Sequence, residues 1–199
     1  MPKGWRIEKL ENVSEMCLGK MLDKQKNIGI PLPYLGNINV RWGEFRLDEL
    51  KLMPFENDEL ERFGLKKGDL VICEGGEPGR CAVWKNDSIT MMIQKALHRV
   101  RVSNDADVWY VYYYITYSSM IGTLTKYFTG TTIKHLTGKE LRKVQLPIPI
   151  IDEQQEIVQE IENRLSVADK MEESINQSLQ QAEALRQSIL KKAFEGKLI

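Results

Sequence analysis

Cysteine and histidine are scarce in this chain of 199 residues. Cys17, Cys73 and Cys81 show no CxxC spacing, and the sequence has only 2 histidines. An odd number of cysteines is a poor basis for a disulfide framework, and no cluster of cysteine and histidine has the spacing of metal ligands. The composition therefore indicates a reduced, cytoplasmic compartment and predicts no metal site.

Long hydrophobic runs are also lacking. No apolar stretch approaches the ~18 residues that a membrane helix needs, and the opening MPKGWRIEKL has no apolar core of a signal peptide. We therefore expect no membrane partner. Lysine plus arginine equals aspartate plus glutamate at 28 each, which excludes a polycation that coats nucleic acid indiscriminately. Any nucleic-acid-binding face must come from local placement of charge.

Recognisable catalytic motifs are missing as well. The sequence GGEPG, which begins at Gly75, lacks the GK[ST] ending of a nucleotide-binding loop. Asp69 and Glu74 do not form a convincing nuclease centre, and no methyltransferase glycine motif or nucleophile–base pair is present. We predict a protein that is not an enzyme and that carries no cofactor of its own.

The part of the chain up to about Leu146 has a mixed α/β pattern. Asp69–Cys73 and Cys81–Trp84 are short β-forming runs joined by the GGEPG turn. Val108–Met120 is rich in aromatic residues whose spacing favours a helix. Base stacking on single-stranded nucleic acid is an alternative for these aromatics, but their spacing is more typical of a core.

A long helix follows this mixed region. Pro147 and Pro149 hold the backbone extended, and Asp152 with Gln155 forms a capping-box-like start. No glycine or proline interrupts the chain from there until Gly196, a C-terminal cap, which predicts a helix of about 40 residues, or roughly 60 Å. The expected domains are 1–150, a mixed α+β globular domain, and 151–199, a long C-terminal α-helix.

An apolar stripe repeats every seven residues along this helix, while the remaining face is polar. A solvated stalk is the alternative, but nearly five repeats favour packing against another helix as an antiparallel coiled coil. The predicted dimerisation residues are Ile161, Ala168, Met171, Ile175, Leu179, Ala182, Leu185 and Ile189.

Several segments together resemble type I restriction-modification specificity subunits. The segment FTGTTIKHLTGKELRKVQLPIPIIDEQQEIV, residues 128–158, is similar to the junction between that family's recognition domain and its spacer helix. The ending LRQSILKKAFEGKLI is similar to the close of the helix, and MPKGWRIEKLENV to the opening of a recognition domain. The family's full subunit has two such domains and two helices, so this chain resembles half of one. A natural half-length subunit and a fragment are both open, and the initial Met1 slightly favours the former.

The resemblance implies a sequence-specific DNA-binding subunit without catalysis of its own. It would bind double-stranded DNA, a second copy of itself, modification subunits and, in some assemblies, a restriction subunit. S-adenosylmethionine, ATP and magnesium would be bound by those partner subunits only. Two copies would read an interrupted palindrome. The alternatives are a coiled-coil adaptor or scaffold whose globular domain binds protein, and an enzyme of unrecognised chemistry.

Phosphate contacts require cations, and base reading requires amides or guanidinium groups. Lys20, Lys24 and Lys26 lie in a polar stretch before a turn predicted at Pro31 and Pro33, where an ordinary solvated loop is the alternative.

Two further segments supply base-reading groups. Asn37, Asn39 and Arg41 alternate along a β-like run that would project them to one side, although asparagines beside Gly36 also form turns. Arg80 follows the glycine turn, which would allow close approach to DNA.

The remaining candidates lie later in the chain. Gln94 opens the segment QKALHRVRV, a predicted strand with one polar edge, in which His98 is expected to be structural. Thr131 and Lys134 lie in a threonine-glycine loop that could bind phosphates or serve only as a junction.

Overall fold

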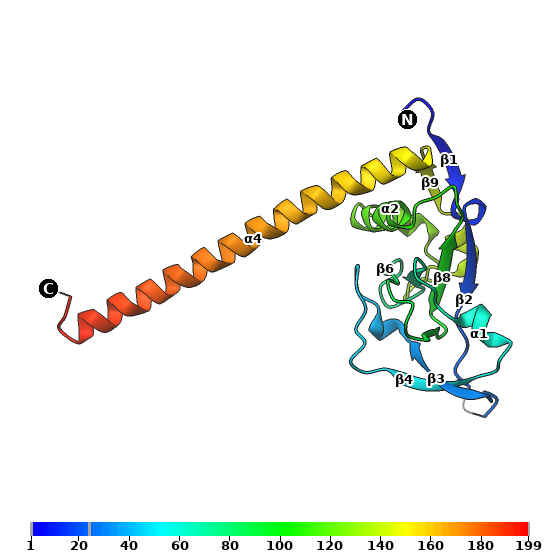
Figure 1. Ribbon diagram of the computed structural model, residues 1–199, viewed down its shortest axis with the longest axis horizontal. Helices are drawn as coiled ribbons and strands as arrows, with labels where there is room; N and C mark the ends of the chain where they lie inside the picture. Colours follow the sequence, from blue (N-terminus) through cyan, green and yellow to red (C-terminus); the bar gives the residue numbers. More distant parts are fainter. Residues whose placement is uncertain (1, 24, 199) are drawn as a thin grey trace. The chain divides into compact units, whose positions relative to one another are not determined.

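The computed structural model describes residues 2–23 and 25–198, and the chain forms two units, Met1–Gln155 and Glu156–Ile199 (Figure 1). We call them the N-terminal unit and the helical unit. The strands are β1 (Arg6–Lys9), β2 (Ser14–Leu18), β3 (Ile30–Leu35), β4 (Lys51–Phe55), β5 (Leu70–Cys73), β6 (Cys81–Val83), β7 (Met92–Ile93), β8 (Leu97–Val102) and β9 (Gln145–Ile148). The α-helices are α1 (Glu59–Phe63), α2 (Val108–Met120), α3 (Gly138–Arg142) and α4 (Ile151–Phe194), and the 3₁₀ turns are η1 (Leu10–Asn12), η2 (Asn37–Asn39) and η3 (Thr123–Tyr127). The predicted mixed fold with a long C-terminal helix is confirmed.

Three β-sheets form the centre of the N-terminal unit. The largest has the order β2-β8-β5-β6 and is antiparallel, the second has the order β4-β3-β7, and the third pairs β1 with β9. The strands predicted before and after the GGEPG turn are confirmed as β5 and β6. Because β2 and β5 both run antiparallel to β8, the loops that follow them and the turn that precedes β8 meet at one edge of the sheet. That edge carries the site described below.

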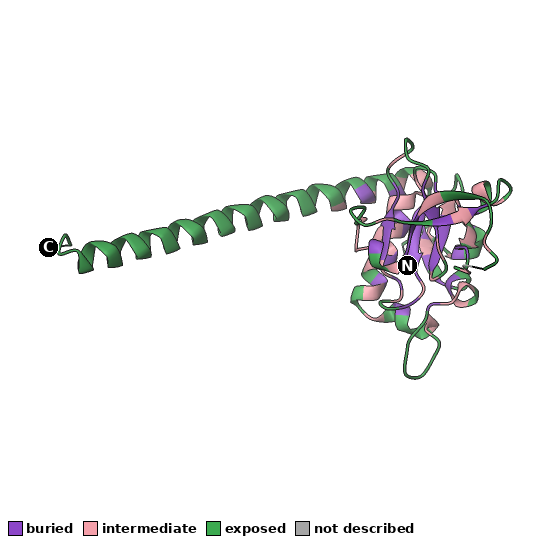
Figure 2. Ribbon diagram, turned by 90° about the horizontal axis from the view of Figure 1, so that it is seen from below, coloured by how far each residue is buried: buried purple, intermediate pink, exposed green. Residues whose placement is uncertain are grey.

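The core lies around the largest sheet. Every residue of Leu70–Cys73 is buried, because this strand is apolar throughout and is covered on both faces. Trp84 is almost fully buried and packs edge-on against Phe45, with ring centroids 5.3 Å apart. Figure 2 shows the buried residues gathered in the N-terminal unit, whereas α4 is exposed along most of its length.

Strand β8 differs from its prediction. It lies in the middle of the sheet rather than presenting a polar edge, and its two polar residues His98 and Arg99 are buried. The Nη1 of Arg99 donates to the carbonyls of Glu61, Arg62 and Gly64 at 2.8–3.1 Å, where α1 ends and leaves carbonyls without helical partners, whereas its buried Nε has no hydrogen-bond partner among the described residues. The polar residues of this strand are thus buried because tertiary partners exist for most of their polar atoms.

The prolines of β3 do not form the expected turn. Pro31 and Pro33 lie in a strand that pairs with β4 along its length. On the other side, β7 pairs only with Tyr34 and Leu35. Proline cannot donate a backbone hydrogen bond, so it is tolerated in a strand where the donor would face no partner. Both prolines occupy such positions.

The β-like run predicted over residues 37–41 is wrong at its start, since Asn37–Asn39 forms the 3₁₀ turn η2. The buried side chain of Asn39 fixes this turn: its Oδ1 accepts from the backbone N–H of Gly36 at 2.9 Å, and its Nδ2 donates to the carbonyl of Arg46 at 3.0 Å. Asparagine competes with the sheet ladder by bonding to nearby backbone. The three predicted readers therefore do not share one face of a strand.

Helix α2 has the predicted bounds. Asp107 caps it by accepting from the backbone N–H groups of Trp109 at 2.8 Å and Tyr110 at 3.0 Å. Tyr110 is buried, and its hydroxyl donates to the carbonyl of Pro147 at 2.7 Å. Tyr117, by contrast, is 57% exposed. The prediction of aromatic core residues is thus confirmed for the start of the helix and wrong for its end.

Helix α4 begins at Ile151. Asp152 therefore lies inside the first turn and does not cap the helix. Gln154 holds this turn instead. It is fully buried, accepts from the backbone N–H of Asp107 at 2.8 Å and donates to the carbonyls of Asp105 at 3.0 Å and Pro149 at 2.9 Å. The start of α4 is therefore fastened to the N-terminal unit by an amide with several partners.

The helix continues for 44 residues, or roughly 66 Å at 1.5 Å per residue. Gly196 ends it in the left-handed conformation with φ 69°, as predicted, and the N–H of Lys197 donates to the carbonyl of Lys192 at 2.8 Å. Among the described residues, no helix is long and apolar enough to span a membrane. Pairing of α4 as a coiled coil stays a prediction.

Candidate nucleic-acid interface

Loops from five parts of the N-terminal unit surround one open hollow of about 600 Å³, which we call the loop hollow. They are the stretch after β2, the turn η2, the glycine loop between β5 and β6, the turn before β8, and a hairpin that ends at His135. The residues that line the hollow are Met21, Leu22, Asn37, Glu74, Gly75, Gly76, Gln94, Lys95, Ala96 and His135. Residues distant in sequence thus share one surface.

Backbone hydrogen bonds join these loops to one another. The N–H of Lys95 donates to the carbonyl of Lys20 at 2.7 Å, and the N–H of Glu74 donates to the carbonyl of Ala96 at 2.8 Å. The N–H of Leu136 in turn donates to the carbonyl of Glu74 at 2.7 Å. Because each loop is bonded to the next, their side chains are held in fixed relative positions.

Arg80 fastens the wall of the hollow. Its Nη2 donates to Asn37 Oδ1 at 2.6 Å and to the Asn37 carbonyl at 3.0 Å, and its Nη1 donates to Glu77 Oε2 at 3.0 Å. Asn37 Nδ2 donates to the carbonyl of Gly75 at 2.6 Å. The Arg80 side chain is only 15% exposed. It lies behind the glycine loop rather than at its tip, where the sequence pattern placed it.

The glycine loop fits closely between its neighbours. A Cβ on Gly75 would lie 3.0 Å from His135 Nδ1, and Gly76 has φ +74°, a conformation that favours glycine. Ala96, which also lines the hollow, adopts φ 85° although it is not glycine. Residues held in this region often occur where function requires a fixed backbone.

The hairpin beside the hollow carries the predicted phosphate loop. Thr129 and His135 exchange backbone hydrogen bonds of 2.8 and 2.9 Å, and every residue between them is exposed. Lys134 Nζ donates to the carbonyl of Gly130 at 2.8 Å, while Thr131 is exposed at the tip. The hydroxyls and the ammonium group are therefore presented next to the hollow.

Two of the three lysines predicted as a phosphate clamp, Lys20 and Lys26, lie in different surroundings. Lys20 is buried: its Nζ forms an ion pair with Glu59, donates to the carbonyl of Pro54 at 3.0 Å and lies 5.1 Å from the ring centroid of Phe55. Burial raises the pKa of Glu59, but the hydrogen bonds from Lys20 and from the backbone, together with the charge of Lys20, lower this pKa by more, so the net shift is downward. Lys20 is thus a structural residue, not part of a solvated loop.

The other two lysines differ from Lys20. The side chain of Lys26 is 85% exposed and lies 3.9 Å from Asp23 Oδ2, which leaves it accessible to phosphate. Lys24 lies outside the described residues.

Of the remaining predicted readers, Asn37 and Gln94 line the loop hollow, whereas Asn39 and Arg41 line a separate hollow of about 240 Å³. Sequence reasoning missed Lys95 and His135. Lys95 is the direct neighbour of Gln94, and that adjacency is the signal by which it could have been included. His135 gave no usable signal, because only the fold brings it against the glycine loop.

His98 lies in the core, as a structural role requires. Its Nε2 is 3.1 Å from the carbonyl oxygen of Leu136. Burial lowers its pKa, which disfavours the charged imidazolium.

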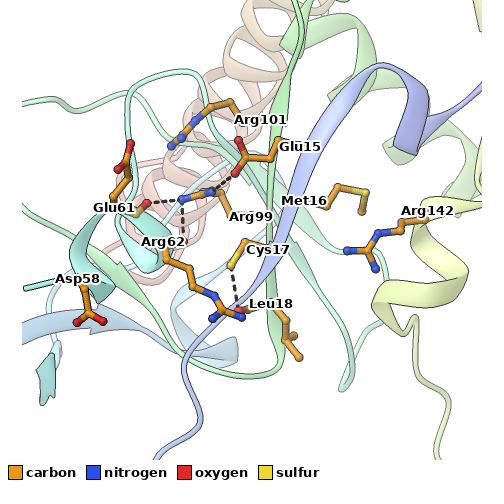
Figure 3. A pocket seen from close by; sticks show the side chains of 10 residues that line it. All are labelled: Glu15, Met16, Cys17, Leu18, Asp58, Glu61, Arg62, Arg99, Arg101 and Arg142. Carbon is orange, nitrogen blue, oxygen red and sulfur yellow. Dashed lines mark hydrogen bonds and ion pairs between the residues drawn. The ribbon is translucent and has the colours of Figure 1, made fainter. Parts of the chain in front are cut away.

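A second groove of about 580 Å³ lies along β2, α1 and β8 (Figure 3). Two of its four arginines are paired with carboxylates: Arg99 Nη2 donates to Glu15 Oε1 at 2.7 Å, and Arg101 forms two 2.7 Å bonds to Asp69. Asp58 and Glu61 also line it. Acidic groups thus accompany the basic ones along this groove and weaken its attraction for a phosphate backbone.

The sequence segment that contains the hairpin is rich in basic residues. Glu140 is the only acidic residue between Val108 and Ile151 in the sequence. The basic residues of the same segment are Lys126, Lys134, Lys139, Arg142 and Lys143. A neutral chain thus has a local excess of positive charge in this segment, and Lys134 carries part of it on the hairpin itself.

The sequence-family model of the type I restriction modification DNA specificity domain matches residues 2–181 of this chain. The chain belongs to this family. It is 30% identical over its whole length to the type I restriction enzyme EcoBI specificity subunit of Escherichia coli, of which it covers 43%. It is 28% identical over 88% of its length to the EcoKI specificity subunit of Escherichia coli strain K12, of which it covers 39%. This chain therefore spans less than half the length of these relatives.

Solved structures agree on the fold. One is a chain from a structure that addresses complex assembly and conformational transition of the type I R-M system. It superimposes with a TM-score of 0.76 at 20% identity, and the match covers 100% of this chain and 47% of that one. The HsdS subunit from Thermoanaerobacter tengcongensis gives a TM-score of 0.70 at 21% identity, with 100% of this chain and 46% of the other covered. The expected half of a specificity subunit, with one recognition domain and one long helix, is confirmed at the level of family and fold.

Proposed function

We propose that this chain is the DNA-reading half of a type I specificity subunit and that the loop hollow is its reading face. The observation that carries the proposal is the convergence of Gln94, Lys95 and the Thr129–His135 hairpin on one surface, whose wall Asn37 holds in place. Amide groups that read base edges and a cation and hydroxyls that hold phosphates are the two kinds of group that sequence-specific binding needs. The chain would recognise one half of a bipartite duplex target.

Gln94 is the main base reader in this proposal. Its backbone is fixed, since its N–H donates to the carbonyl of Leu35 at 3.0 Å, and its half-buried side chain lines the hollow. Glutamine pairs in two places with the N6 and N7 edge of adenine. The side-chain amide of Asn37 is already hydrogen-bonded to Gly75 and Arg80, so Asn37 positions the wall of the loop hollow. Met21 and Leu22, both exposed, offer apolar contact to a thymine methyl group.

The hairpin and the lysines supply the phosphate contacts. Thr131, Lys134 and Lys95 are exposed beside or on the hollow, and Lys26 is exposed in the loop after β2. Such contacts set register on the duplex without reading sequence. Binding should therefore weaken with salt for every sequence and should depend on Gln94 only for the preferred one.

Catalysis would belong to partner subunits. Modification subunits would bind S-adenosylmethionine and transfer the methyl group, and a restriction subunit would use ATP and magnesium. The family name assigns DNA specificity to this domain, and the solved relative belongs to an assembled type I system. The chain would act in the cytoplasm, without a cofactor of its own.

A second copy of the chain would supply the other half of the target. Ile175, Leu179 and Met171 of α4 are each more than 60% exposed, which is unusual for large apolar side chains repeated along one stripe. Pairing of two stripes would bury them. Two identical readers related by a twofold axis would bind an interrupted palindrome, with half-sites about 34 to 36 Å or a multiple of that apart.

The test is selection of duplex oligonucleotides by the purified chain, alone and with the modification subunit of its system. We expect one enriched bipartite palindrome and loss of its preference in Gln94→Ala, with little change in binding to random duplex. Gln145→Ala, an exposed glutamine on β9, is the matched control and should retain the preference. Enrichment of no sequence under either condition would reject the proposal and favour the protein-binding adaptor.

A further inference from the structure

Strand β2 is an outer strand of the largest sheet, and its free edge carries unpaired backbone groups. The N–H of Gly19 donates to the carbonyl of Leu97 at 2.9 Å, which shows that Gly19 faces the β8 side. Antiparallel strands bond to each other at every second residue, so Met16 and Leu18 direct their N–H and C=O groups away from β8. No described residue accepts a hydrogen bond from either N–H or donates one to the Met16 carbonyl.

Two other outer strands are protected in ways that β2 is not. All of β6 is buried, and α2 packs against it. Strand β4 carries Lys51 and Pro54, residue types that discourage pairing at an edge. Strand β2 has neither lysine nor proline, and its single charged residue, Glu15, is bonded to Arg99. The edge of β2 therefore remains able to pair with a further strand.

The groove of about 580 Å³ shown in Figure 3 runs along this edge, and we call it the edge groove. Four consecutive residues of β2, numbers 15–18, line it. Successive residues of a strand point to opposite faces of the sheet, so the edge groove reaches both faces of β2. A single extended segment lying in it would continue the sheet.

Helices border the edge groove on both faces of β2. Arg99, which is opposite Cys17 in the register, donates to the carbonyls at the end of α1, so α1 lies on the Cys17 face. A Cβ on Gly138 at the start of α3 would lie 3.3 Å from Cε1 of His98, which is opposite Leu18. Helix α3 therefore lies on the Leu18 face. The space between the two helices follows the direction of β2.

Each bordering helix contributes one arginine that lacks a carboxylate partner. Figure 3 shows the side chains of Arg62 from α1 and Arg142 from α3 directed toward β2, whereas those of Asp58 and Glu61 point away from it. Both arginines are exposed, and neither forms an ion pair with another described residue. A segment with one carboxylate toward each face would supply the missing partners.

The groups along the edge also separate a protein segment from other occupants. A DNA duplex has no row of amide and carbonyl groups to pair with the outward groups of Met16 and Leu18. In an antiparallel pair of two β2 strands, equal faces of both sheets lie on the same side. The unpaired arginines of the two copies, Arg62 and Arg142, would then gather along one seam without carboxylates. A separate acidic segment meets both requirements.

We propose that the edge groove binds an extended acidic segment of a partner protein, which adds to the four-stranded sheet beside β2. Backbone hydrogen bonds to Met16 and Leu18 supply affinity, and carboxylates against Arg62 and Arg142 supply selectivity. Because these arginines lie on opposite faces, the two acidic residues of the segment are an odd number of positions apart. Apolar residues of the segment pack on Met16 and Leu18, of which Leu18 is 38% exposed. The inference does not depend on the DNA-reading face.

The first test is selection of short random peptides, displayed on phage, by the purified chain. We expect enriched peptides with two acidic residues an odd number of positions apart and with apolar neighbours. A labelled synthetic copy then reports binding by fluorescence anisotropy. Strand addition uses the N–H of every second peptide residue, so N-methylation of one alternate set should abolish binding and methylation of the other set should not. Enrichment of no peptide, or equal effects of both sets, would overturn the proposal.

The edge of β2 can be altered without breaking its ladder to β8. Met16→Pro removes an outward N–H and should abolish peptide binding, while the protein still unfolds cooperatively on heating. Met16→Ala loses the same side chain but keeps the N–H, and should retain most of the binding. Peptide binding that is equal in Met16→Pro and in the wild type would contradict strand addition. If Met16→Pro does not fold, the N-methylated peptides decide the question.

The arginines have a separate test. Arg62→Ala and Arg142→Ala should each weaken peptide binding about fivefold, the upper range for an exposed ion pair. Arg6→Ala, on β1 and outside the edge groove, should leave it unchanged. Duplex DNA that displaces the peptide, and whose own binding is lost in Arg62→Ala and Arg142→Ala, would assign the edge groove to DNA and refute the proposal. A dimer that dissociates in Met16→Pro would assign the edge to a second copy and refute it as well.

Discussion

Arg80 holds Asn37 in place: one guanidinium nitrogen donates both to the side-chain oxygen of Asn37 at 2.6 Å and to its carbonyl at 3.0 Å. Asn37 passes this constraint on by donating to the carbonyl of Gly75. Two residues that the sequence offers as separate DNA readers therefore act as one device that fixes the wall of the loop hollow. Their importance for recognition is in positioning.

Replacing Arg80 should accordingly affect both stability and DNA binding. Arg80→Ala leaves Asn37 without its charged partner, and we expect a loss of about 1–3 kcal/mol in the free energy of unfolding. DNA affinity should fall as well, because the glycine loop and η2 lose their connection. Urea unfolding followed by tryptophan fluorescence measures the first effect. Arg46→Ala, an exposed arginine on the same unit, should change neither property, and a stable Arg80→Ala protein would contradict the positioning role.

Lys134 should behave differently from Arg80, because it is exposed on the hairpin and bonded only to the carbonyl of Gly130. Lys134→Ala should leave stability within ±0.5 kcal/mol. It should weaken binding to all duplexes alike and reduce the slope of log affinity against log salt by about 1. Fluorescence anisotropy at several salt concentrations measures this slope. Lys9→Ala on β1 is the control, and an unchanged slope in Lys134→Ala would remove the hairpin from the interface.

Much of the architecture follows from local sequence pattern. The aromatic spacing predicts α2 with its observed bounds, because Asp107 caps it and Gly122 follows its end. The heptad repeat and Gly196 predict α4 because a seven-residue apolar period and a glycine cap are both local signals of a helix. In both cases the information lies within a few turns of the chain.

The parts that sequence misplaced depend on contacts between distant residues. Lys20 reads as a solvated lysine until Glu59 and the carbonyl of Pro54 are brought to it by the fold. Arg99 is buried because the end of α1 presents three carbonyls. For the site, Asn37 and Gln94 were identified as residue types, but their meeting with His135 follows only from the sheet order. Residue chemistry was thus predictable where geometry was not.

His98 predicts a pH dependence of stability. Its pKa is lowered below 6.5, chiefly by burial, so the unfolded chain binds a proton more readily than the folded one. Stability should therefore fall as the pH drops below about 6.5, by at most about 1.4 kcal/mol per pH unit. His98→Gln, whose amide can still donate to Leu136, should lose this part of the dependence. His135→Gln should retain it, and a wild-type stability that is flat from pH 7 to pH 5 would contradict the assignment.

The last prediction concerns Ile175, which is 66% exposed in the single chain and lies in the middle of the apolar stripe through which two copies would pair. Ile175→Glu places a carboxylate in the middle of each stripe, where pairing would remove its water. We expect the dimer to dissociate to monomer at micromolar concentration, as measured by light scattering on the eluting protein. Gln177→Glu adds the same charge on the polar face and should leave the dimer intact. Because α4 in a monomer still starts from the same Gln154 anchor, the N-terminal unit should unfold at an unchanged temperature in Ile175→Glu. A dimer that survives the substitution would show that the stripe is not the contact between copies, and palindromic target recognition would then need another source of symmetry.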